Sequence, residues 1–352
     1  MVVAHTCPVG GIFNISEYLT MPWFALLMGC GLALAWRAAA RDPRTPGWWF
    51  GLTGTLRGLV LVLLGQALVP VHQQVLVVLQ TLGIAQVAVA WLVPVLVGRP
   101  RITLAAATAI WLVSPVVISA AVARVREGLA QPWEPLLGWA AAGPDYRAIT
   151  MVVWVLLGVV AIDVLAPASH SAVSRSAADR SSVRRVGLEA LALAAITAVW
   201  HVVGKARLGE NFYPYTGSLA ETGHNALLAL TATWACRWLL MAAESGSLGV
   251  QRALGSVVVA LEPVTSLGRL ALTAYAVQLV LLGAIVRFVL RGGRDDHWWV
   301  MLLTIAVLTL GAFIWERLGW VRPVEAIPRA VVLVAEHLRR ATHGRDTPRT
   351  TA

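Results

Sequence analysis

The stretch ITMVVWVLLGVVAIDVL, Ile149–Leu165, is apolar throughout except for Thr150 and Asp163. A helix of about this length crosses the hydrocarbon core of a bilayer. The pattern recurs along the chain, where apolar runs alternate with short polar segments. We predict nine full spans: Tyr18–Ala38, Trp48–Val69, Val75–Val97, Ile102–Val125, Ile149–Leu165, Val186–Val203, Asn225–Ala243, Ser266–Leu290 and Trp298–Leu318. The predicted fold class is therefore all-α, a polytopic helical membrane protein.

The composition excludes several other classes of protein. Of 352 residues, 58% are hydrophobic and 13% are charged, with a mean hydropathy of +0.72. Soluble domains are about 25% charged, so a soluble enzyme and a disordered chain are both excluded. The apolar runs are too long for the strands of an outer-membrane barrel. Cys7, Cys30 and Cys236 are far apart and lie in or beside apolar runs, which indicates buried thiols and neither a disulfide scaffold nor a metal site.

Most of the basic residues behind the net charge of +10 lie between the spans. Alternate loops are rich in arginine, and the longest of them, ASHSAVSRSAADRSSVRR, ends at Arg185. The positive-inside rule places these loops and the C-terminal tail in the cytoplasm and the YPYTGS loop outside. Nucleic-acid binders gather basic charge on one face, so we expect a bilayer partner and no nucleic acid.

The two ends of the chain differ from the spans. The N-terminal stretch MVVAHTCPVGGIF is too short to cross a membrane, yet the topology requires the chain to have crossed before Tyr18. We interpret it as part of a first span whose start lies upstream; a short re-entrant N-terminus is the alternative. Residues 1–352 are expected to form one domain with a tail from about 326, in which Pro328–Arg340 predicts an amphipathic cytoplasmic helix.

Ionisable residues inside apolar runs are costly and therefore functional candidates. His5 could act as a general base or an acyl-accepting nucleophile, or simply pack. Asp163 is interpreted as a helix-end residue that reaches water, and His201 as a packing residue. The glutamines of the spans are expected to form hydrogen bonds between helices; they are Gln66, Gln80, Gln86 and Gln278.

The segment YPYTGSLAETGHN holds a dense group of polar side chains. They are Tyr213, Tyr215, Thr216, Ser218, Glu221, His224 and Asn225. Ser218 and Glu221 have the spacing of a capping box, which begins a helix. His224 and Glu221 could instead form an acid–base pair.

A second segment, LEPVTSLGRLALTAYAVQLVLL, places Arg269, Thr273, Tyr275 and Gln278 at helical spacing on one face. Arg269 could bind a phosphate or extend to the membrane interface. The residues alone leave two functions open, a membrane-embedded transferase and a transporter.

Several of these segments resemble one family. MVVAHTC resembles the end of a first span that closes on a histidine, matched by His5. YPYTGSLAETGHNALLAL resembles a Pro-His-Ser-Gly loop, with Tyr215 in place of the histidine. EPVTSLGRLALTAYAVQ resembles a Gly-Arg-Met-Ala-Leu-Thr-x-Tyr-x-x-Gln segment, and RPVEAIPR resembles a closing motif that includes Glu325 and Arg329. The family is that of the bacterial YeiB-like membrane proteins, related to the heparan-α-glucosaminide N-acetyltransferases and, more distantly, to other integral-membrane acyltransferases.

This resemblance implies an acyltransferase of the bacterial inner membrane. It would move an acyl group, in the simplest case acetyl, from cytosolic acyl-CoA to an envelope sugar or another small acceptor outside. The resemblance implies that His5, with His224 and Glu221, carries the chemistry, and that Arg269 holds a CoA phosphate or pairs with Glu262 or Glu325. The expected substrate-binding residues are Tyr213, Tyr215, Thr216, Ser218, Asn225, Tyr275 and Gln278.

Two departures from the family pattern matter. The Asp and Arg-Gly that precede the first-span histidine are absent, and the loop histidine is Tyr215. The rival hypotheses are a transporter or flippase of a small or lipid-linked metabolite, and a non-enzymatic assembly partner. No metal is expected, since HExxH and paired-cysteine patterns are missing, and a homo-oligomer is left open.

Overall fold

The computed structural model describes Val3, Thr6 and residues 15–42, 45–71, 77–128, 131–165, 180–245 and 262–343, and these contain helices and turns but no strand. The long helices are α2 (Ile15–Ala39), α3 (Gly47–Leu68), α6 (Pro100–Arg126), α8 (Ala148–Leu165), α9 (Arg180–Leu208), α10 (Leu219–Ser245), α13 (Ala271–Ala284), α14 (Trp298–Arg317) and α15 (Pro323–His343). The shorter elements are α4 (Leu79–Ala90), α5 (Val93–Leu96), α7 (Trp133–Leu137), α12 (Glu262–Arg269), η2 (Val69–Val71), η3 (Gly138–Ala142), η4 (Gly209–Phe212) and η5 (Ile285–Val289). The all-α prediction is confirmed for these residues.

Eight helices of the described chain are long and apolar enough to cross a membrane. They are Ile15–Ala39, Gly47–Val71, Pro100–Arg126, Ala148–Leu165, Ser182–Phe212, Leu219–Ala243, Ala271–Val289 and Trp298–Arg317. Large apolar side chains remain exposed on them, including Val116 on α6 (70% exposed) and Leu191 on α9 (68%). Extended apolar surfaces of this kind are typical of contact with lipid, so the described chain has the character of a membrane protein.

The remaining predicted range, Val75–Val97, is not a continuous helix. Residues 77–97 contain α4 and α5, separated by a turn at Trp91 and Leu92. Pro94 has no N–H to donate to the carbonyl of Ala90, and its ring clashes with that carbonyl in a helix, so α4 ends there. Its twelve residues span about 18 Å, which is less than the thickness of a bilayer core.

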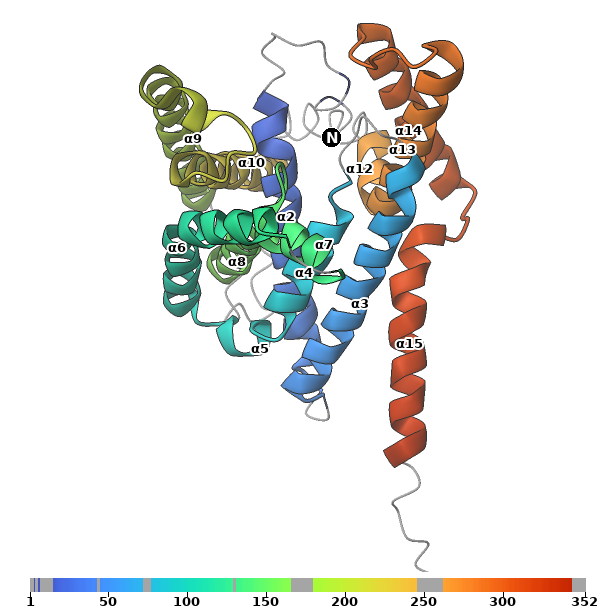
Figure 1. Cartoon of the computed structure of the whole chain (residues 1–352). Coiled ribbons are helices and arrows are strands. Elements are labelled where there is room, and N and C mark those ends of the chain that lie inside the picture. The colour runs from blue at the N-terminus through green and yellow to red at the C-terminus, as the bar shows by residue number, and fades with distance from the viewer. Residues whose placement is uncertain are drawn as a thin grey trace, which may run out of the picture.

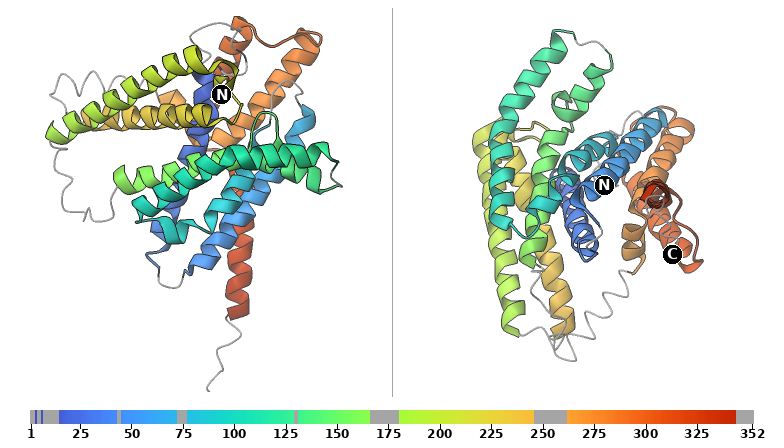
Figure 2. Two further views of the ribbon diagram at one scale, coloured as in Figure 1. Left: turned by 60° about the vertical axis from the view of Figure 1, so that its left-hand side comes forward. Right: turned by 90° about the horizontal axis from the view of Figure 1, so that it is seen from below.

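The helices form three groups. Figure 2 (right) shows α6, α8, α9 and α10 on one side and α12 to α15 on the other, with α2 to α4 between them. Figure 2 (left) shows α9 and α10 running across the direction of α3 and α15. The predicted amphipathic tail lies within α15, which packs along α3 (Figure 1). Helix α10 contacts α2 of the middle group as well as α6 and α8 of its own group.

Two glycines permit a close contact between α2 and α8. A Cβ atom on Gly29 would lie 1.9 Å from the carbonyl oxygen of Val155, and one on Gly158 would lie 2.0 Å from that of Leu26. Small residues let two helix backbones approach closely where lipid gives no hydrophobic driving force.

The same helix pair holds a buried ion pair. The Arg37 guanidinium lies 2.6 Å from the Asp163 carboxylate, whose side chain is 3% exposed. Asp163 also accepts a hydrogen bond from the backbone N–H of Gly98 at 2.9 Å. The prediction that Asp163 reaches water is therefore wrong. Its carboxylate instead connects α8 to α2 and to the turn before α6.

Candidate functional site

The candidate site is built on the first turns of α10. The Ser218 hydroxyl accepts the backbone N–H of Glu221 at 3.1 Å, which is one half of the predicted capping box. The Glu221 side chain turns back and accepts the N–H of Gly217 at 3.1 Å. Glu221 is 3% exposed and also accepts a hydrogen bond from the side-chain amide of Asn225. The helix start thus buries a carboxylate and supplies it with donors.

A chain of hydrogen bonds leads from this carboxylate to two histidines. The Nδ1 atom of His224 lies 3.3 Å from the Asn225 carbonyl oxygen, and its Nε2 atom lies 3.2 Å from Nδ1 of His201 on α9. Because the Asn225 amide group donates to Glu221, its oxygen faces His224 and can only accept. In the neutral rings His224 therefore donates through Nδ1 and accepts through Nε2 from His201, and every donor points toward Glu221.

Aromatic rings enclose the histidine pair. The rings of Tyr18 and Phe212 lie 5.2 Å and 5.0 Å from the ring of His224, centroid to centroid. The Tyr18 hydroxyl donates to the carbonyl of Phe212 at 3.1 Å. His224 has no exposed surface, so the surrounding rings hold it in one position.

Three tryptophans fix the backbone that carries these groups. The indole N–H of Trp111 on α6 donates to the carbonyl of Leu219, and that of Trp154 on α8 donates to Thr222. Trp200 on α9 donates to the carbonyl of Ala220 at 3.1 Å. Three neighbouring helices therefore hold the first turn of α10.

Arg147, just before α8, holds the loop that precedes α10 through a hydrogen bond. It is 8% exposed, and it donates to the carbonyl of Tyr215 at 2.9 Å. Tyr215 has a φ of 72° and Gly217 a φ of 70°, both in the left-handed region. A Cβ atom on Gly217 would lie 2.6 Å from Nη1 of Arg147, so this approach requires glycine. Burial lowers the pKa of Arg147, and the charges of Glu221 and Asp145 oppose that shift.

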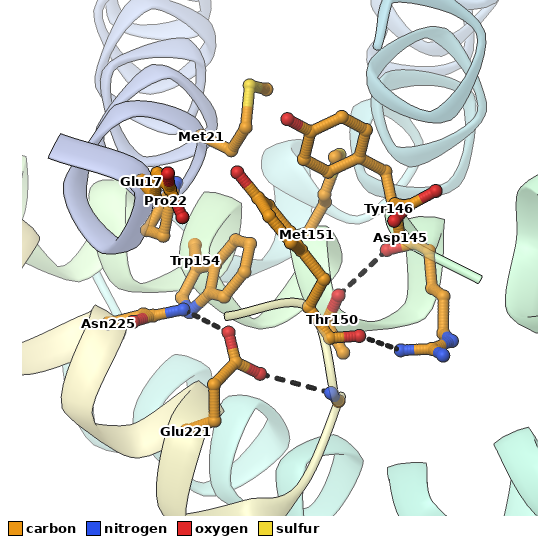
Figure 3. A pocket seen from close by; sticks show the side chains of 13 residues that line it. Glu17, Met21, Pro22, Asp145, Tyr146, Thr150, Met151, Trp154, Glu221 and Asn225 are labelled. Atoms are coloured by element: carbon orange, nitrogen blue, oxygen red, sulfur yellow. Dashed lines mark hydrogen bonds between the residues drawn. The ribbon is translucent and has the colours of Figure 1, made fainter. Parts of the chain in front are cut away.

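Glu221 lines a small cavity of about 20 Å³, enough for about one water molecule. Figure 3 shows Glu221 and Asn225 on one side of it and Tyr146 and Asp145 on another. Asp145 and Tyr146 also line a wider cavity of about 650 Å³ with Gln80, Glu134 and Trp139 among its walls. Asp145 and Tyr146 therefore belong to the walls of both cavities.

Two tyrosines, Tyr146 and Tyr215, line the small cavity. The rings of Tyr146 and Tyr215 pack edge to face with centroids 5.2 Å apart. Burial raises the pKa of Tyr215 to about 12 and that of Tyr146 well above its usual value. Burial also raises the pKa of Asp145, against the opposing charge of Arg147. Both phenols remain protonated donors at neutral pH.

The structure brings together Tyr215, Glu221, His224 and Asn225 from the predicted set. Thr216 and Ser218 bind the carbonyl of Asn211 and shape the loop. Tyr213 is 60% exposed. His5 lies outside the described residues.

Tyr275 and Gln278 lie on α13, apart from α10. The Tyr275 hydroxyl accepts the backbone N–H of Val78 at 3.3 Å, and the Nε2 atom of Gln278 is buried without a hydrogen-bond partner. Tyr275 is near enough to Tyr146 to add, after burial, to the rise in the pKa of that phenol.

Arg269 is 53% exposed and pairs with Glu316 at 2.8 Å, not with Glu262 or Glu325. Glu262 pairs with Arg317. Glu325 accepts the backbone N–H groups of Leu272 and Thr273, both at 2.9 Å, and so caps the start of α13. The phosphate-binding role predicted for Arg269 therefore competes with an ion pair already formed.

Sequence reasoning did not assign two members of the site. His201 was interpreted as a packing residue, although the structure joins it to His224. The sequence patterns assign no role to Arg147; its place directly before the apolar span Ile149–Leu165 is the available signal.

The described residues thus form a helical protein with eight apolar helices long enough to span a membrane and a buried polar site on α10. No group of three or more His, Cys, Asp or Glu within them is placed to hold a metal ion. Comparison with protein-family models, with curated proteins and with solved structures gives no match for this chain.

Proposed function

We propose that the chain is an integral-membrane acyltransferase, as its resemblance to the YeiB-like family implies, with Glu221 as the group that accepts the proton of the acceptor. The observation that supports this is the direction of the hydrogen bonds from His201 through His224 and Asn225 to Glu221. They hold one carboxylate at the wall of a cavity, and a positioned carboxylate can act as a general base.

The two cavities give the acceptor a route to this base. The wide cavity, about 650 Å³, has room for a sugar-sized molecule, and the small cavity, about 20 Å³, has room only for a hydroxyl or amine group. The acceptor would bind in the wide cavity against Tyr146 and Asp145 and direct its reacting group toward Glu221.

In the reaction, the acceptor oxygen or nitrogen attacks the acyl carbonyl carbon of the thioester. A C–O or C–N bond forms, the C–S bond breaks, Glu221 takes the acceptor's proton, and CoA leaves as a thiolate that is then protonated. Arg147 would stabilise the charge of Glu221, since opposite charges favour each other's ionised form. His5 remains our candidate for a second base or a transient acyl carrier. We place the donor side and the C-terminus in the bacterial cytoplasm and the acceptor side outside.

Release of CoA from acetyl-CoA by the detergent-purified chain tests this proposal. We expect release above the background of protein-free detergent, loss of release in His224→Ala, and loss in His5→Ala if His5 carries the acyl group. Thr197→Val is the matched control, because Thr197 forms a hydrogen bond with Thr231 between the same two helices, α9 and α10, outside the site. Absence of release from the unmodified chain with acetyl-CoA and with longer acyl-CoAs contradicts the proposal.

A transporter is the second candidate, and two observations favour it. Cavities lie at both ends of α3, one beside Val69 and the other beside Trp48 and Arg57. The helices α4–α5 and α12–α13 are also interrupted, and discontinuous helices mark the sites of many transporters. This function predicts flux of a labelled metabolite into proteoliposomes without acyl-CoA, whereas the acyltransferase predicts none.

A further inference from the structure

A second large cavity lies away from the candidate site, between the start of α3 and the C-terminal half of α15. Its volume is about 1030 Å³, at the upper end of the roughly 300–1,000 Å³ found for small-molecule sites. Its walls include Asp42, Trp48, Trp49, Arg57, Glu336 and Arg339. It shares no lining residue with the two cavities near Glu221.

Arg57 is the most unusual member of this cavity. It is the single charged residue of α3 and lies ten residues after Gly47, about 15 Å along the helix axis. A charged side chain at such a position in an apolar helix is costly and marks a site by default. The cavity gives its guanidinium group a polar space to enter.

Charged side chains of both signs lie around Arg57. The Glu336 carboxylate attracts the Arg57 guanidinium, while the guanidinium of Arg329 is near enough to repel it. Across the cavity, the Arg339 guanidinium lies 4.9 Å from the centre of the Trp49 ring, within cation–π distance. The cavity lining thus holds two guanidinium groups, those of Arg57 and Arg339, and two carboxylates, those of Asp42 and Glu336.

Aromatic side chains supply the other half of the site. Trp48 is 53% exposed, and its ring packs edge to face on Trp49 with centroids 5.7 Å apart. Phe50 is buried and lines the same cavity. Guanidinium groups bind phosphate through charge-assisted hydrogen bonds, and aromatic faces accept flat or apolar groups.

We propose that this cavity binds a phosphate-bearing ligand, with the phosphate between Arg57 and Arg339 and an aromatic or apolar portion against Trp48. Two sources carry this chemistry, a CoA-type nucleotide and an anionic phospholipid headgroup. The nucleotide would be the donor of the proposed acyl transfer and so deepens that function, whereas binding of phosphate itself does not depend on it.

The test is binding to the full chain purified in detergent, measured by isothermal titration calorimetry. The probes are CoA, dihexanoyl phosphatidylglycerol and inorganic phosphate. We expect one of the first two to bind and to weaken about tenfold or more in Arg57→Gln and in Arg339→Gln, the loss typical of a charge-assisted hydrogen bond. Binding of CoA alone identifies a nucleotide site, and binding of the lipid alone identifies a headgroup site.

Two further variants keep the test decisive if Arg57→Gln does not fold. Glu336→Gln removes a competing carboxylate and is expected to tighten binding several-fold. Arg185→Gln is the control, because Arg185 is an exposed arginine that pairs with Glu189 on α9, and it should bind like the unmodified chain. The proposal is wrong if neither CoA nor the lipid binds, or if the folded arginine variants and Glu336→Gln all bind with unchanged affinity.

Measuring both ligand binding and CoA release distinguishes failure of this proposal from failure of the proposed function. Binding that depends on Arg57 and Arg339 without any CoA release supports the site and contradicts the acyltransferase. Release of CoA that is unchanged in both arginine variants supports the acyltransferase and contradicts a donor site here.

Discussion

His201 on α9 and His224 on α10 face each other with 3.2 Å between Nδ1 and Nε2, although 23 positions separate them in the chain. The pair joins two helices and continues through Asn225 to Glu221. It is therefore both a structural contact and the outer end of the hydrogen-bond chain that orients the buried carboxylate.

The histidine contact predicts a combined loss of stability and activity in His201→Leu. Removal of one partner leaves His224 buried with an unmet hydrogen bond, which costs about 1–3 kcal/mol in the free energy of unfolding. Thr197→Val breaks the Thr197–Thr231 hydrogen bond between the same helices and should lower stability alone. Thermal unfolding and CoA release, measured on both variants, check this; equal retention of activity would argue against a role for the histidine pair.

The Arg37–Asp163 ion pair predicts a larger loss in Asp163→Asn. Breaking a buried pair leaves a charge without its partner and typically costs about 3–5 kcal/mol; since the Arg37 side chain is 19% exposed, we expect the lower end of that range. The control is Glu127→Gln, which breaks an exposed pair with Arg124 and should cost less than about 1 kcal/mol. Chemical unfolding in detergent compares the two, and similar losses would contradict the account of Asp163.

The contact between α2 and α8 predicts that Gly29→Ala is strongly destabilising. Its Cβ would lie 1.9 Å from the carbonyl oxygen of Val155, so the helices must separate, and such overpacking costs about 1–3 kcal/mol. Gly31→Ala, two residues away on the same helix, meets no atom within 4 Å and should be neutral or slightly stabilising. Thermal unfolding of the two variants tests this prediction. Equal unfolding midpoints for both would show that α2 and α8 do not approach so closely.

The buried phenol of Tyr215 predicts a loss of stability at alkaline pH. Because burial raises its pKa to about 12 in the folded protein, against an unfolded value of about 10, the folded state holds the proton more tightly. Its contribution to stability is full below pH 10 and falls as the pH rises from about 10 to 12. Tyr215→Phe should flatten the fall in unfolding midpoint between pH 9 and pH 12, whereas Tyr213→Phe, at an exposed position, should leave it unchanged.

The sequence allowed the helices and part of the site to be predicted. Apolar runs define eight of the helices because helix length and hydropathy are local properties, and the Ser218–Glu221 spacing correctly indicated a helix start. The break between α4 and α5 was missed because the average hydropathy of Val75–Val97 does not register the missing N–H of Pro94.

Partners across helices could not be predicted in the same way. Arg269 pairs with Glu316, 47 residues away, and Arg147 binds the carbonyl of Tyr215, 68 residues away. Both contacts depend on how separate segments of the chain pack in three dimensions, which no local sequence pattern specifies.

The most direct test of the central claim is the rate of CoA release by Glu221→Gln beside Thr197→Val and the unmodified chain. Glutamine keeps the size of Glu221 and can still accept through its oxygen, but it cannot take up a proton at neutral pH. We predict that Glu221→Gln elutes as a folded protein and loses about 100-fold or more of the rate, as removal of a general base does, while Thr197→Val stays within a few-fold. Release by Glu221→Gln at the unmodified rate would contradict the claim that this carboxylate accepts the proton of the acceptor.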